Sequence, residues 1–176
     1  MNDIDKSISR ASVLLKSPDK KEDYIVLKLK PYNILCCCFH CWPKTWKSIN
    51  QYILPKGPIE DEGDVLLSAG EGKYVLECHE SGPEIVIYLG IVAGSLTLIN
   101  SVIDLIKKIL TATQKEDRKK PDKIKLFRYR QIGNKTEEKE IMEIEFPLSE
   151  KAAKLLEKHI SSILLKSSKR LRTFDR

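Results

Sequence analysis

The sequence predicts an α+β fold, in which a small antiparallel sheet packs against helices. Three observations indicate this fold. A β-branched run at 24–30 and two hairpin patterns, at 64–79 and 123–146, predict five strands. A long apolar stretch at 84–113 predicts a helix, and an amphipathic pattern at 149–165 predicts a closing helix. The 176 residues suit one compact domain, or one small domain with an appendage.

The first region, residues 1–81, is expected to hold a strand, a Cys-rich loop and a hairpin. The run YIVLKLK at 24–30 is β-branched and then alternates, so it predicts a strand that Pro31 ends. A short helix is expected near 44–53. Gly70-Glu71-Gly72 separates two apolar runs, which is typical of a hairpin turn.

The second region, residues 82–165, opens on the most distinctive segment of the chain. The segment begins with Ser81, Pro83 and Glu84, and residues of these types suit the start of a helix. The stretch Ile85–Ile103 then contains 19 residues and no charge. At ~1.5 Å per residue a helix of this length just crosses the apolar core of a bilayer. We therefore expect one long apolar helix over 84–113.

A narrow stripe of small and polar residues is expected along this helix. Its members recur at spacings of 4, 3, 4, 3 and 4, and they are Gly90, Gly94, Thr97, Ser101, Asp104 and Lys108. One interpretation is that the small residues let another helix approach closely, as Gly-xxx-Gly pairs do. The other interpretation is that the stripe is the solvent-exposed side of a helix packed under a sheet. We predict the first five members as interaction residues.

The apolar remainder of the 84–110 helix gives two hypotheses for its surroundings. Its apolar face is wider than a small sheet covers, and exposed apolar area usually marks a protein partner. We therefore expect a protein partner or a second copy to bind through this helix. The alternative is a membrane anchor: the basic flank at 107–120 supports it as a positive-inside signal, whereas Asn100 and Asp104 oppose it.

The second hairpin is predicted to neutralise charge internally. KIKLFRYR at 123–130 is rich in Lys and Arg, and EKEIMEIEF at 138–146 is rich in Glu. Antiparallel pairing sets these opposite charges across from each other, at ~0.2–1 kcal/mol per pair. The apolar face of the closing helix is expected to consist of Leu156, Ile160, Ile163 and Leu164, and a basic tail follows at 166–176.

The net charge of +6 lies entirely in the last third of the chain, because residues 114–176 carry a net +7. A basic surface can face nucleic acid. The hairpin neutralises part of this charge, aromatic residues make up 7% of the chain, and no RNA-binding signature is present. Nucleic acid is therefore not the partner we expect.

Five cysteines raise the question of a metal or thiol site. Cys38 and Cys41 have C-x₂-C spacing, and Cys78-His79 follows downstream, so a zinc module or a cysteine-dependent enzyme is one alternative. The other alternative is that the cysteines are free thiols, which pack like small apolar side chains. The start MNDIDKSISR has no apolar segment of a secretory signal, so a cytoplasmic chain with reduced thiols is expected. We assign no catalytic residue, metal ligand or cofactor.

The order of elements from 82 to about 165 carries a family resemblance. A Gly-Pro-Glu start, the helix IVIYLGIVAGSLTLINSVIDLIKKIL, a basic linker, a β-hairpin and a closing amphipathic helix follow one another. This layout resembles the effector-associated constant component family of bacterial conflict systems. The resemblance implies a non-enzymatic accessory partner of an effector in bacterial defence. The functional hypothesis is therefore a non-catalytic protein-interaction component.

Overall fold

The computed structural model describes residues 24–34, 36, 40–53, 65–69, 72–79, 84–90, 96–117, 120–132 and 135–171. Within these ranges the elements are, in chain order, β1 (Tyr24–Pro31), α2 (Pro43–Ile53), β2 (Val65–Ala69), β3 (Gly72–His79), β4 (Glu84–Gly90), α3 (Leu96–Thr113), β5 (Lys123–Ile132), β6 (Lys135–Glu145) and α4 (Glu150–Leu171). The protein is α+β, as predicted. Residues 1–23, Gly70-Glu71 of the hairpin turn and residues 172–176 of the basic tail lie outside the described residues.

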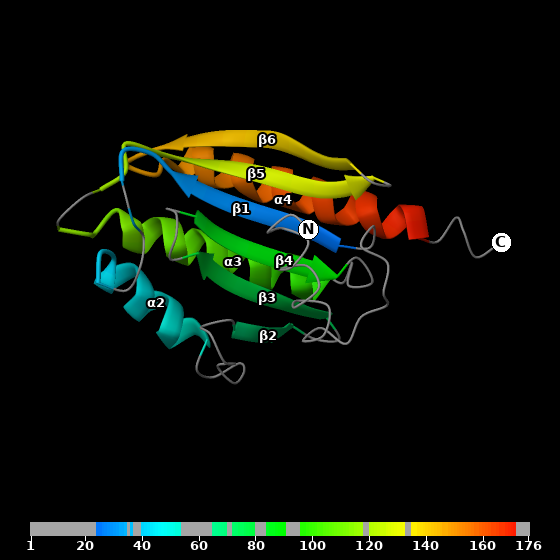
Figure 1. The fold of residues 1–176 in the computed structure, drawn as a ribbon, viewed down its shortest axis with the longest axis horizontal. Coiled ribbons are helices and arrows are strands. Elements are labelled where there is room, and N and C mark those ends of the chain that lie inside the picture. The colour runs from blue at the N-terminus through cyan, green and yellow to red at the C-terminus, as the bar shows by residue number, and fades with distance from the viewer. Residues whose placement is uncertain are drawn as a thin grey trace.

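The described strands form one antiparallel sheet in the order β2-β3-β4-β1-β5-β6. β1 is central, and its Lys28 lies opposite Val86 of β4 on one side and Phe127 of β5 on the other. Helices α3 and α4 lie behind the sheet in Figure 1, and α2 lies beside α3. Strands of the regions 1–81 and 82–165 therefore share one sheet.

The prediction of one long helix over 84–113 is wrong, because the segment begins as a strand. β4 pairs with β3 and with β1 as an interior strand, and only α3 is helical. Its β-branched residues suit a strand, and an interior strand needs no polar alternation. Ile85 and Ile87 of β4 are fully buried. The membrane-anchor alternative required a single helix here, and no helix of the described residues is long and apolar enough to cross a membrane.

One core fills the space between the sheet and the helices. Leu27 and Leu29 of β1 contribute to it, since alternate residues of a strand face the same side. Helix α3 buries ten residues, namely Leu98, Ile99, Val102, Ile103, Leu105, Ile106, Ile109, Leu110, Ala112 and Thr113. The expectation that this apolar face is left over for a partner is therefore wrong, because its residues are buried in the core between the sheet, α2 and α4.

The opposite face of the sheet has its own small apolar cluster. Val26 lies opposite Tyr129 in the register, and Val26, Phe127 and Tyr129 are buried outside the main core. The ammonium of Lys28 lies 5.6 Å from the ring centre of Phe127 and 4.6 Å from that of Tyr129. Both distances are within cation–π range. These two aromatic side chains are therefore packed against the sheet and are not available for stacking on bases.

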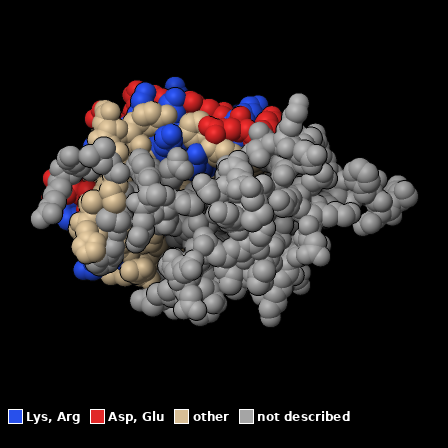
Figure 2. Space-filling model, in the orientation of Figure 1, with Lys and Arg blue, Asp and Glu red and all other residues tan. Residues whose placement is uncertain are grey.

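The β5–β6 hairpin carries the predicted ladder of opposite charges. Lys125 lies 2.8 Å from Glu140 and 3.6 Å from Glu143, and Lys123 lies 3.0 Å from Glu143. Figure 2 shows the result as blue and red side chains interspersed along the upper rim, over β5 and β6. The prediction that this hairpin neutralises much of its own charge is confirmed.

The two remaining helices begin within one residue of the predicted positions, but α4 continues to Leu171, into the segment expected to be a basic tail. Lys, Arg and Leu are good helix formers, so the helix extends beyond its apolar face. α2 occupies the range expected for the short helix. In α4, the residues Leu156, Ile160 and Leu164 are buried, and Ile163 is half-buried against the core. The helical period of these apolar residues explains why this helix could be predicted.

Candidate functional site: a lysine-lined groove between α2 and α3

Helix α2 packs along α3 through one face. Pro43 stands in its first turn, where a missing N–H does no harm. Thr45, Ile49 and Tyr52 then recur at helical spacing, and all three are buried. The other side of α2 carries exposed polar residues, so the two helices leave a groove between their solvent-facing sides.

Hydrogen bonds fix α2 to α3 at both ends. Near the start of α2, Glu116 Oε1 accepts from the backbone N–H of Thr45 at 2.6 Å and from its hydroxyl at 2.8 Å. At the end of α2, the hydroxyl of Tyr52 donates to the backbone carbonyl of Ser101 at 3.0 Å. The relative position of the helices is therefore held by polar contacts as well as by the core.

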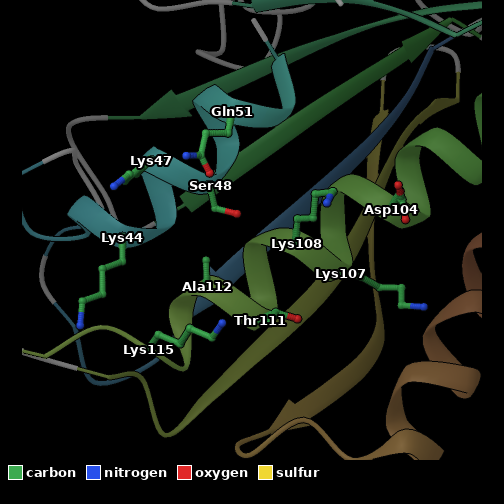
Figure 3. Close-up of a pocket in the computed structure, with 10 residues that line it drawn as sticks. All are labelled: Lys44, Lys47, Ser48, Gln51, Asp104, Lys107, Lys108, Thr111, Ala112 and Lys115. Atoms are coloured by element: carbon green, nitrogen blue, oxygen red, sulfur yellow. The ribbon is translucent and has the colours of Figure 1, made fainter. Parts of the chain in front are cut away.

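Between these two contacts lies an open groove of about 520 Å³. Figure 3 shows that its walls come from α2 on one side and α3 on the other. The lining residues are Lys44, Lys47, Ser48, Gln51, Asp104, Lys107, Lys108, Thr111, Ala112 and Lys115. Five lysines face one carboxylate, so the groove is strongly basic.

Two of the five lysines already hold a carboxylate of the chain. Lys44 Nζ lies 2.6 Å from Asp117, and Lys107 Nζ lies 2.7 Å from Glu157 of α4. The hydrogen bond from Lys44 lowers the pKa of Asp117, and the hydrogen bond to Glu157 raises the pKa of Lys107. Figure 3 shows Lys107 extending away from α2, as this pairing requires.

The other three lysines have no ion pair within the described part of the chain. Lys47, Lys108 and Lys115 are all exposed. Lys108 reaches across to α2, where its ammonium lies 5.6 Å from the ring centre of Tyr52. These amines carry a positive charge at neutral pH. The groove can therefore attract and hold anionic groups, and lysine ammoniums bind them as point charges with adaptable reach.

The structure separates the five predicted interaction residues. Gly90 ends β4, and Gly94 lies outside the described residues. Thr97 and Asp104 are exposed on α3, and Asp104 lines the groove. Ser101 is half-buried and is used to hold Tyr52. For α3 itself, the stripe is the solvent side of a helix packed under a sheet, which was the second of the two interpretations.

The groove itself was not predicted from the sequence, although one signal pointed to it. The stripe continues beyond Asp104 at spacings of 4, 3 and 4 through Lys108, Thr111 and Lys115, all of which line the groove. The lysines of α2 gave no such signal, because they become neighbours of α3 only through packing.

The candidate zinc site remains a prediction. Cys38 lies outside the described residues, and the side chains of Cys78 and His79 are not described. Cys36 is half-buried, and Cys41 is an exposed free thiol. Over the described ranges, no three His, Cys, Asp or Glu side chains gather as a metal site would require.

Comparison with known proteins gives no further constraint on the site. No known protein family, curated protein or solved structure matches this chain.

Proposed function

We propose that this protein is a non-catalytic interaction component that binds a partner protein at the solvent-facing surface of α2 and α3. The observation that carries the proposal is the basic groove, in which Lys47, Lys108 and Lys115 have no intramolecular ion pair in the described residues. Charged groups gathered on one surface steer a complementary partner and fix its orientation.

The packing of α3 supports a polar contact surface. Its apolar face is already buried in the core, so a partner meets the opposite side, where Thr97, Asp104 and Lys108 are exposed. Leu96 is 70% exposed at the start of the same helix and adds an apolar contact beside the polar ones. Interfaces commonly combine an apolar anchor with a polar rim.

The biological role that we propose is that of an accessory partner of an effector in a bacterial defence or conflict system. This part rests on the resemblance of the element order, of which α3, the β5–β6 hairpin and α4 are present and the start of the long helix is not. We also propose a cytoplasmic location, which the exposed free thiol of Cys41 supports.

Site-specific photo-crosslinking in the source cells tests the proposal. A photoreactive amino acid is placed at Thr97 or Thr111, both exposed on the proposed surface, and at Glu140 of β6 as the matched control. We expect one defined protein to be crosslinked from the two α3 positions and not from Glu140. The same protein crosslinked equally from all three positions, or no crosslinked protein at all, contradicts the proposal.

A further inference from the structure

We infer that the groove between α2 and α3 accepts an acidic peptide segment, whose carboxylates pair with Lys47, Lys108 and Lys115. This inference rests on the proposed function and names the chemistry of the partner.

The groove's own ion pairs indicate which ligand its lysines take. Lys44 and Lys107 each hold a carboxylate, at 2.6 Å and 2.7 Å, from Asp117 and Glu157. These contacts neutralise two of the five lysines. Asp104 adds one more negative charge to the wall, so the groove keeps an excess of positive charge that intramolecular carboxylates leave unmatched.

The spacing of the remaining lysines fits a peptide. Lys108 lies on α3, and Lys115 lies in the turn that directly follows Thr113, the last residue of α3. At the helical rise, their separation of seven residues is about 10.5 Å along the helix axis. An extended chain advances about 3.3 Å per residue, so acidic residues three apart in the partner reach both lysines. Lys47 lies on α2, on the opposite wall of the groove (Figure 3). A third carboxylate of the peptide can therefore pair with Lys47 from the α2 side.

The composition of the walls favours carboxylates over nucleic acid. The residues that line the groove include neither an aromatic ring nor an arginine among the described side chains. Single-stranded nucleic acid is usually held by aromatic stacking together with basic residues, and the walls of the groove lack the aromatic rings that stack on bases. Ser48, Gln51 and Thr111 instead offer hydroxyl and amide groups that suit a peptide backbone.

Binding of a labelled acidic peptide to the full chain tests the inference. The probe is fluorescein-labelled hexaglutamate, followed by fluorescence anisotropy at low salt, with hexaglutamine as the neutral peptide. The triple variant Lys47→Ala, Lys108→Ala and Lys115→Ala is compared with Lys139→Ala, Lys151→Ala and Lys158→Ala. Both sets remove three exposed lysines, so the change in net charge is the same.

We expect the groove variant to weaken hexaglutamate binding about tenfold, the combined effect of three exposed ion pairs, and the control variant to weaken it less than twofold. Binding should also decline between 50 mM and 500 mM salt, because exposed charges are screened. Circular dichroism verifies that both variants remain folded.

Three results would overturn the inference: equal weakening by the two variants, tighter binding of an oligothymidylate of equal charge, or no preference for hexaglutamate over hexaglutamine. Its failure can be told apart from that of the proposed function. A partner crosslinked at Thr97 whose binding survives the groove variant overturns the acidic segment and leaves the interaction role. Hexaglutamate binding without any crosslinked protein overturns the interaction role and leaves the preference of the groove for acidic peptides.

Discussion

A single oxygen of Glu116 accepts two hydrogen bonds from Thr45, one from its backbone N–H at 2.6 Å and one from its hydroxyl at 2.8 Å. Both residues are buried. Thr45 lies in the first turn of α2, where backbone N–H groups lack helical partners and the helix dipole is positive. The carboxylate of Glu116 therefore serves as a cap supplied by a distant part of the chain, just after α3.

Replacing this buried carboxylate by an amide should destabilise the fold. In Glu116→Gln the hydrogen bonds lose their charge, so we expect the free energy of unfolding to decrease by about 1–3 kcal/mol in urea denaturation. Glu150→Gln is the control, since Glu150 is exposed and its pair with Lys154 should change stability by less than about 0.5 kcal/mol. Equal effects of the two substitutions would show that Glu116 does not cap α2.

The bond between Tyr52 and Ser101 should matter for stability, while the neighbouring Thr97 should not. Tyr52→Phe removes the donor to the Ser101 carbonyl, and we expect a loss of about 1 kcal/mol in thermal or urea unfolding. Thr97→Ala, at an exposed position of the same stripe, should change stability by less than about 0.5 kcal/mol. A larger effect at Thr97 than at Tyr52 would contradict this division of roles.

Truncating the interior of β4 should be far more damaging than truncating the exposed start of α3. Ile87 is fully buried beneath the helices, so Ile87→Ala should decrease the free energy of unfolding by about 2–5 kcal/mol. Leu96→Ala removes a side chain that is 70% exposed and should change it by less than about 0.5 kcal/mol. Comparable losses would place Ile87 outside the core and exclude the observed sheet.

The charge ladder of the β5–β6 hairpin should make part of the stability depend on pH. The hydrogen bond from Lys123 lowers the pKa of Glu143 below its ordinary value of 4.5. A lowered carboxyl pKa stabilises the folded state above the ordinary value, and this contribution is lost as the pH falls through the lowered value. The difference in urea midpoint between the protein and Glu143→Gln should therefore be present at pH 7 and shrink below about pH 4.

A double-mutant comparison isolates this effect. In a Lys123→Met, Lys125→Met background, Glu143 has lost the two cations that face it, so the pH dependence of the Glu143→Gln difference should disappear. An unchanged pH profile in that background would assign the effect to other groups.

Most of the fold follows from local patterns in the sequence. The alternation that places Leu126 and Ile144 in the core and charged residues outside is a period-two pattern, and the spacing of Leu156 and Ile160 is helical. β4 was missed because an interior strand and a buried helix can both be uncharged and apolar over a short run. The β-branched residues of β4 favour a strand over a helix. The prediction of a helix gave more weight to the absence of charge over the whole segment.

The candidate site was less accessible to sequence reasoning, for a physical reason. The sequence predicts Asp104 and Lys108 on one stripe because both lie on one helix. Lys44 and Lys47 reach the same groove only because Thr45 and Tyr52 dock α2 onto α3. Contacts between residues some sixty positions apart depend on packing, which no local period encodes.

The central place of β1 has a consequence for how the chain acquires its structure. Val26 pairs with Tyr129, about a hundred residues further along. The three-stranded unit β2-β3-β4 and the β5–β6 hairpin can each form from neighbouring segments, and among the described strands only β1 joins them. β1 is synthesised before both units, yet it can complete its pairing only after β5 has been made. Such non-local pairing is typical of proteins that fold slowly, on the millisecond-to-second scale.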